Sequence, residues 1–131
     1  MKGLIMLVDD DEDFVESTKK LLENASYEVT VACSGKECLE MIKSVKPSLI
    51  VLDIMMESLG EGYSVTHALR YDERYSQLRH VPILMVSSIQ EHPVERFALS
   101  GDAAMISPDS YLTKPLEIDK FLERVAKLVA S

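Results

Sequence analysis

Residues 4–13 read LIMLVDDDED, five apolar residues followed directly by five acids. A short run that is apolar at every position, rather than at alternate positions, is typical of a strand buried on both faces of a sheet. The acids end this run abruptly. The stretch therefore predicts a fully buried strand with carboxylates at its carboxyl end.

The same alternation of short strand and amphipathic helix continues along the chain. Apolar positions recur at helical spacing over 14–25, and β-branched residues follow over 27–31. Ser34 and Glu37 have the spacing of a capping box, which predicts a helix to about Val45. The remaining pattern predicts strands over 48–52, 81–86 and 111–113 and helices over 64–73 and 118–129.

Five strand and helix units in succession predict an α/β fold with a parallel sheet covered on both faces. The common solution is the flavodoxin-like, doubly wound, five-stranded sheet with strand order 2-1-3-4-5. Residues 70–80 are interpreted as a long polar link, and glycine and prolines interrupt residues 90–110. We expect an atypical fourth helix that is short, displaced or partly disordered. No linker divides residues 1–131, so one domain is predicted.

Charge and composition exclude several classes of function. The 131 residues hold 22 acids and 14 bases, a net charge of −8, which argues against binding nucleic acid or an anionic membrane surface. No apolar run approaches the roughly 20 residues of a membrane span, and the start lacks the layout of a signal peptide. Cys33 and Cys38 are too few for a disulfide scaffold. A reduced, cytoplasmic protein is therefore expected.

Polar residues follow the strands in a consistent way. Asp9 and Asp10 follow the first predicted strand, Asp53 the third, Ser87 the fourth and Lys114 the fifth. The carboxyl ends of parallel strands share one edge of a sheet, and ligands bind there beside the point where the strand order reverses. We therefore expect these five side chains to converge.

Three converging carboxylates repel one another, by about 4 kcal/mol for a pair 4 Å apart at an effective dielectric constant of 20. A hard divalent cation offsets this repulsion, and ligands that are all oxygen suit Mg²⁺. The positive charge of Lys114 and the hydroxyl of Ser87 could then contact a phosphoryl group. This set of residues predicts phosphoryl transfer to a carboxylate nucleophile.

These residues resemble the receiver domains of two-component response regulators, and the resemblance covers essentially the whole chain. It rests on four motifs that occur in order at the ends of strands. They are Val8-Asp9-Asp10-Asp11, Leu52-Asp53-Ile54-Met55-Met56, Val86-Ser87-Ser88 and Tyr111-Leu112-Thr113-Lys114-Pro115.

The resemblance implies a role for each metal-site residue. Asp53 corresponds to the phospho-acceptor and Asp10 to the direct ligand of Mg²⁺, for which Mn²⁺ is a possible substitute. Asp9 corresponds to the second acid, which acts on the metal mainly through water. The main-chain carbonyl of Met55 would complete the protein ligands.

The resemblance also implies a switch and a partner. Ser87 corresponds to the switch hydroxyl, Lys114 to the phosphate-binding lysine and Tyr111 to the aromatic ring that reports the switch. The bond between Lys114 and Pro115 is expected to be cis. The phosphoryl donor would be a sensor histidine kinase or phosphotransfer protein, while the downstream target or output domain stays unknown. The domain would be no enzyme beyond catalysing its own phosphorylation and dephosphorylation.

Simpler interpretations stay open beside these roles. Asp11, Glu12 and Asp13 are better read as the cap and first turn of a helix than as metal ligands. Tyr111 is also explained as an aromatic at the edge of the core, and Ser87 as a capping residue.

The sequence departs from the family pattern in the loop after Met56. Glu57 and Ser58 stand where the family usually has proline and glycine, so Glu57 could alter metal affinity or the rate of dephosphorylation. The irregular stretch 90–110 puts in doubt the face that such domains commonly use for output or dimerisation.

Two other functions compete with this interpretation. A phosphatase of the haloacid dehalogenase type also uses an aspartate after a strand, but it needs a second aspartate where Met55 stands. A receiver-like module that acts without phosphorylation is the second alternative. No output domain follows Ser131, so a stand-alone regulator and a fragment of a longer protein both stay open.

Overall fold

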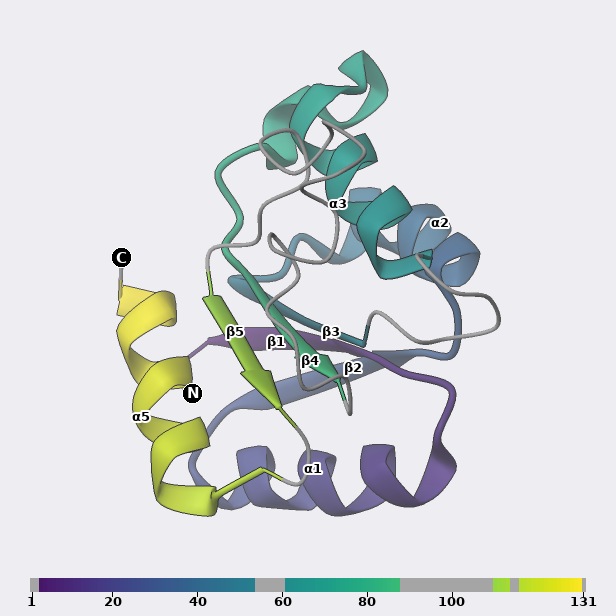
Figure 1. Cartoon of the computed structure of the whole chain (residues 1–131). Coiled ribbons are helices and arrows are strands. Elements are labelled where there is room, and N and C mark those ends of the chain that lie inside the picture. Colours follow the sequence, from purple (N-terminus) through teal and green to yellow (C-terminus); the bar gives the residue numbers. More distant parts are fainter. Residues whose placement is uncertain (1–2, 54–60, 88–109, 114–115, 131) are drawn as a thin grey trace, which may run out of the picture.

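A computed structural model describes residues 3–53, 61–87, 110–113 and 116–130 (Figure 1). The described chain alternates between strands and helices in the predicted way, with a 3-10 helix, η1, before β4. The elements are β1 Leu4–Val8, α1 Glu12–Asn24, β2 Glu28–Ala32, α2 Gly35–Val45, β3 Leu49–Asp53, α3 Glu61–Tyr71, η1 Glu73–Leu78, β4 Ile83–Ser87, β5 Ser110–Thr113 and α5 Ile118–Ala130.

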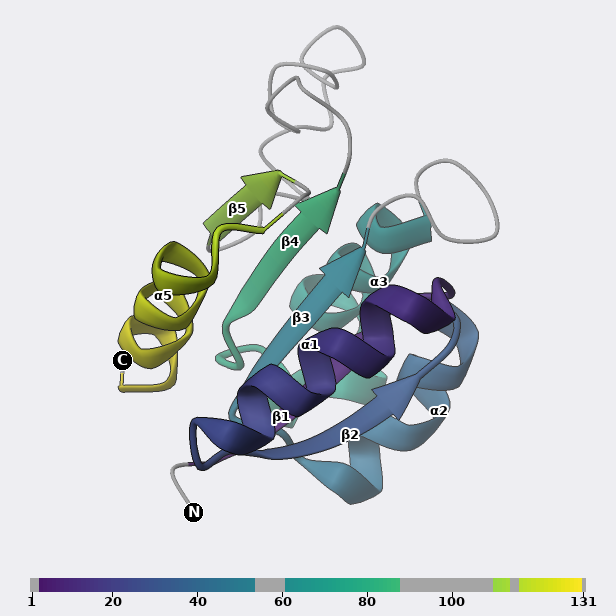
Figure 2. The same ribbon diagram turned by 90° about the horizontal axis from the view of Figure 1, so that it is seen from below.

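The five strands form one sheet in the order β2-β1-β3-β4-β5, and every neighbouring pair is parallel. Helices α1 and α5 cover one face, and α2 and α3 cover the other (Figure 2). The predicted flavodoxin-like order and the doubly wound arrangement are confirmed. The prediction for the fourth helix falls on residues 90–110, most of which lie outside the described residues.

The apolar side chains of β1 pack on both faces of the sheet. Successive side chains of a strand point to opposite faces. Ile5 and Leu7 accordingly pack with α1 and α5 in one buried cluster, while Met6 and Val8 pack with α2, α3 and η1 in the other. All four are 0% exposed. A central strand between two helical layers has no wet face, which is why the run does not alternate with polar residues.

The first two helices begin at the residues that the sequence indicates. The Asp11 carboxylate accepts hydrogen bonds from the backbone N–H groups of Asp13 and Phe14, and so caps α1. The Ser34 hydroxyl oxygen accepts one from the N–H of Glu37 at 3.1 Å and caps α2. Both capping predictions are confirmed. Each cap satisfies N–H groups that the first helical turn leaves without a partner.

The segment after α3 differs from the expected polar link. Helix α3 begins at Glu61 and ends at Tyr71, and the chain then forms η1, in which Tyr75 and Leu78 are buried. Tyr75 has non-helical backbone angles (φ −117°, ψ 22°) that kink η1, and both side chains pack in the cluster beneath α2 and α3. Tyr75 and Leu78 stand among polar residues in the sequence. Their spacing of three residues was the only indication there of an element that packs on the core.

None of the helices in the described part of the chain is long and apolar enough to span a bilayer.

Candidate functional site

The register of the sheet brings Asp9 beside Asp53. Val8 of β1 lies opposite Leu52 of β3. An aspartate follows each of these two residues. Asp9, directly after β1, and Asp53, the last residue of β3, therefore lie side by side at the carboxyl edge of the sheet. Strand β1 also borders β2 on its other side, so the cluster lies where the order of the strands reverses.

Three carboxylates gather at this edge. One oxygen from each of Asp9, Asp10 and Asp53 can be chosen so that all lie within 4.8 Å of one another. Asp9 is 1% exposed and Asp53 is 4% exposed, whereas Asp10 is exposed to solvent. The predicted convergence of these three residues is therefore observed, with two carboxylates recessed and one at the surface.

Two hydrogen bonds, one from the backbone of Asp9 and one to its side chain, hold Asp9 at the turn between β1 and α1. Its N–H donates to the Ala32 carbonyl at 3.2 Å, which extends the β1 and β2 pairing by one residue. Its Oδ1 accepts the N–H of Asp11 at 2.9 Å. Asp11 then directs its own carboxylate to the start of α1. Asp9 and Asp11, two residues apart, thus have different roles, because the turn points Asp9 toward β3 and Asp11 toward the helix.

The cluster has the donor set of a site for a hard divalent cation. At an effective dielectric constant of 20, two carboxylates at this separation repel by about 3–4 kcal/mol, and solvent lowers the share of exposed Asp10. Oxygen ligands, partial exposure and room for water suit Mg²⁺ better than a soft metal. The residues present fit such an ion.

The other predicted residues are placed only in part. Ser87 ends β4 and lies opposite Thr113 of β5, one position beyond the pairing of Val86 with Asp53. Tyr111 lies within β5, opposite Met85. Their backbones therefore lie at or near the edge that carries the acids.

The remaining predictions at this edge lie outside the described residues. They concern the Met55 carbonyl, Lys114, the bond before Pro115 and the loop containing Glu57.

A hollow of about 360 Å³ adjoins the cluster on its β2 side. Asp9 and Asp10 line it together with Glu12 and Glu16 of α1, and Lys19 and Cys33 complete its polar wall. Sequence reasoning assigned Glu12 only to the first turn of the helix. The spacing of Glu12 and Glu16 puts them on one side of α1 and was the signal that both accompany the aspartates.

The family follows from comparison with known proteins. The sequence profile of the response regulator receiver domain matches residues 5–126. The chain belongs to this family. Among curated relatives, the polar-differentiation response regulator DivK of Brucella ovis is 31% identical over 128 residues, which span 95% of this chain and 94% of the relative. The protein is therefore a receiver domain of the two-component response regulator type.

Solved structures agree with this family. The receiver domain of the Francisella response regulator 1452 is 30% identical, with a TM-score of 0.78, and the match covers 98% of this chain and 97% of that one. The receiver domain of a signal transduction histidine kinase from Syntrophus aciditrophicus has a TM-score of 0.82 at 23% identity, over 98% of this chain and 90% of that one. The second likeness concerns the fold alone.

Proposed function

We propose that this receiver domain accepts a phosphoryl group on Asp53 from a phosphohistidine of a sensor histidine kinase or phosphotransfer protein. The observation that carries the proposal is the grouping of Asp9, Asp10 and Asp53 within 4.8 Å at the carboxyl edge of the sheet. Family membership supports the same reaction.

In the proposed reaction an oxygen of the Asp53 carboxylate attacks phosphorus. The new O–P bond forms as the N–P bond of the phosphohistidine breaks, and the imidazole nitrogen leaves with the electron pair and takes up a proton. Positioning and charge stabilisation supply most of the catalysis in such a transfer. Asp53 is suited to it because β3 fixes its backbone and the core leaves only 4% of the residue exposed.

Asp9, Asp10 and Asp53 would hold Mg²⁺, or Mn²⁺ in its place, together with the main-chain carbonyl of Met55. The ion would neutralise charge on the phosphoryl oxygens. Asp9 already accepts the Asp11 N–H, and this bond fixes the orientation of its carboxylate. We propose that Asp9 acts on the ion through water, as family resemblance implies.

Ser87 and Lys114 would contact the phosphoryl oxygens, and Ser87 and Tyr111 would form the switch. Ser87 and Tyr111 belong to the neighbouring strands β4 and β5, so a pull on the Ser87 hydroxyl would shift the population of states at the face of these strands. The altered face would control a partner or an output domain. We further propose a cytoplasmic, single-domain unit over residues 1–131 that catalyses no reaction beyond its own phosphorylation and dephosphorylation.

Incubation with acetyl phosphate and Mg²⁺, followed by intact mass measurement, tests the proposal. We expect wild-type protein to gain the mass of one phosphoryl group and Asp53→Asn to gain none. The matched control is Asp119→Asn, which removes an exposed carboxylate in the first turn of α5 and should leave the adduct unchanged. An adduct that survives Asp53→Asn contradicts the assignment. No adduct and no Mg²⁺-dependent change in wild type would favour a module that acts without phosphorylation.

A further inference from the structure

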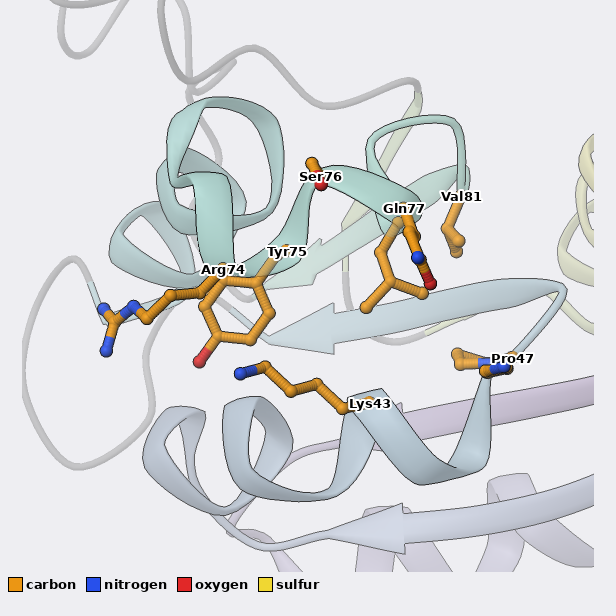
Figure 3. A pocket seen from close by; sticks show the side chains of 9 residues that line it. Lys43, Pro47, Arg74, Tyr75, Ser76, Gln77 and Val81 are labelled. Atoms are coloured by element: carbon orange, nitrogen blue, oxygen red, sulfur yellow. The ribbon is translucent and has the colours of Figure 1, made fainter.

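A second polar hollow lies at the opposite edge of the sheet from the acidic cluster. It is a groove between α2 and η1 with a volume of about 570 Å³ (Figure 3). Lys46 and Pro47 precede β3, and η1 precedes β4, so the groove lies at the amino edge of these strands. Its volume is within the range of about 300–1,000 Å³ that is usual for ligand sites. We call it the amino-edge groove.

The walls of the amino-edge groove have defined supports. Helix α2 ends at Val45. Its capping residue Lys46 donates its N–H to the Ile42 carbonyl, and the left-handed backbone of Lys46 (φ 51°) turns the chain away from the helix. The chain then turns into Pro47. On the other side, the Arg70 guanidinium donates to the carbonyls of Arg79 and Val81 at 2.8 and 3.1 Å. This ties the segment that follows η1 to α3.

The amino-edge groove is positively charged in a chain whose net charge is −8. Lys43, Lys46 and Arg74 line it, and no lining residue is an acid. Arg74 forms an ion pair with Asp72 at 2.7 Å, and this interaction lowers the pKa of the Asp72 carboxyl to about 2. Asp72 is therefore ionised at neutral pH and offsets Arg74. Two lysine charges are left, so an anion is the ligand that the groove would attract.

The same groove has an apolar surface. Leu78 and Pro47 are buried and Val81 is partly buried, while Gln77 and Ser76 stay exposed at the rim. Lys43 reaches from α2 toward the Tyr75 ring, with its Nζ 5.1 Å from the ring centroid (Figure 3). A ligand that uses both surfaces would carry negative charge and an apolar group.

The cations are spread along the groove and do not converge on one point. Arg74 lies at one end, Lys43 near the middle and Pro47 at the other end (Figure 3). Lys46 also lines the groove and directly precedes Pro47 in the chain. A compact anion such as phosphate is held by donors that surround one centre. Charges spaced along a groove instead match carboxylates spaced along a chain.

We propose that the amino-edge groove binds an acidic peptide segment of a partner protein, with one apolar side chain of that segment against Leu78 and Val81. Lys43 and Lys46 would pair with its carboxylates. This contact is separate from the phosphoryl site, because the two sites lie at opposite edges of the sheet.

Fluorescence anisotropy with the labelled peptide EELEE at low ionic strength tests the proposal. We expect measurable binding to wild type and roughly tenfold weaker binding to the double variant Lys43→Gln/Lys46→Gln, because two exposed charge contacts are lost. Added salt should weaken the wild-type complex as it screens these contacts. The matched control is Lys120→Gln/Lys127→Gln, which removes two exposed charges from α5 and should change the affinity less than twofold.

Two further peptides separate charge from apolar contact. QQLQQ should fail to bind, and EESEE should bind several times more weakly than EELEE. Lys43 contacts Tyr75, so circular dichroism must show that the double variant is folded. If it is not, Lys46→Gln alone should weaken EELEE by roughly threefold, since its exposed side chain supports no part of the core.

Several outcomes would overturn the proposal. These are no binding of EELEE to folded wild type, equal binding to the two double variants, or displacement of the peptide by inorganic phosphate at equimolar concentration. Self-association of the protein that disappears in Lys43→Gln/Lys46→Gln would identify a second copy as the occupant, and would also overturn it.

Discussion

Asp9 and Asp53 are carboxylates that the core keeps almost completely from water, although each has another acid within 4.8 Å. Such a cluster weakens the fold until a cation or a proton neutralises it. Repulsion among these carboxylates therefore lowers the free energy of unfolding, and binding of a divalent ion would raise it again. Single residues at this site should therefore affect stability and metal affinity in opposite directions.

Asp9→Asn should raise the free energy of unfolding by about 1–2 kcal/mol when EDTA removes divalent ions, because one buried negative charge is gone. The asparagine oxygen can still accept the Asp11 N–H that Asp9 accepts. Urea denaturation with EDTA and then with MgCl₂ measures both effects. Wild type should gain more stability from Mg²⁺ than the variant. A variant less stable than wild type in EDTA would contradict the repulsion, and Asp119→Asn is the exposed control.

The two cysteines should differ sharply in reactivity. Burial raises the pKa of the Cys38 thiol to about 12, and its Sγ lies 3.6 Å from the Met6 Sδ inside the core. Cys33 is exposed. We expect one thiol to react with Ellman's reagent at pH 8 in the native protein and two in denaturant. Cys33→Ser should leave no fast reaction, and a fast reaction in that variant would contradict the burial of Cys38.

The same thiol makes stability depend on alkaline pH. The usual thiol pKa is 9.0, so the unfolded chain releases this proton above pH 9 while the folded protein keeps it until about pH 12. The contribution of Cys38 is therefore complete below pH 9 and is lost as the pH rises toward 12.

At the scale of elements, α1 depends on a cap that belongs to the acidic run. Asp11→Ala removes the acceptor for the N–H groups of Asp13 and Phe14 and should lower the free energy of unfolding by about 1 kcal/mol. Asp13→Ala removes a charge from the same first turn but no capping bond, and should cost less than about 0.5 kcal/mol. Urea denaturation of both variants checks the difference. Equal losses would show that charge, and not the cap, stabilises this end of the helix.

Element boundaries followed the sequence where the pattern was local and strong. The helix starts at Asp11 and Ser34 were predicted from capping residues alone. In contrast, α3 begins three residues before the predicted Ser64. The η1 segment was missed because Tyr75 and Leu78 give too short an apolar pattern, and their burial depends on the surface that α2 and the sheet offer.

At the scale of the whole molecule, the sheet separates two apolar clusters. Ile42 of α2 lies in one cluster, and Phe121 of α5 lies in the other; both are 0% exposed. Substitutions on opposite faces share no neighbours, so their effects on stability should add.

Ile42→Val and Phe121→Leu should each cost about 1 kcal/mol, and the double variant should equal their sum to within about 0.5 kcal/mol. Urea denaturation of the two single variants and the double variant measures the coupling. The comparison within one face is the double variant Phe121→Leu/Val125→Ala. Its loss of stability should differ more from the sum of the single losses, because residues four apart on α5 are neighbours. If the double variant differs from the sum of the single variants by more than about 1 kcal/mol, the two apolar clusters do not contribute independently to stability.

The alternation of strands and helices, the order of the sheet and the acids at its carboxyl edge could all be predicted from the sequence. Periodicity and capping residues act over short stretches and give the elements, and the rules for crossovers in parallel sheets then leave few possible strand orders. The acidic run 9–13 could be divided in this way as well. Asp9 and Asp10 were predicted to converge with Asp53 and Asp11 to cap the helix, and the structure shows this convergence and this cap.

The depth at which Asp9 and Asp53 are buried, the nearness of Asp10 to them and the basic groove between α2 and η1 could be seen only in the folded chain. These properties depend on strand register and on how separate elements pack. Residues 43–47 and 74–81 show no relation along the chain. They lie close together because β3 pairs with β4, and each segment directly precedes one of these two strands.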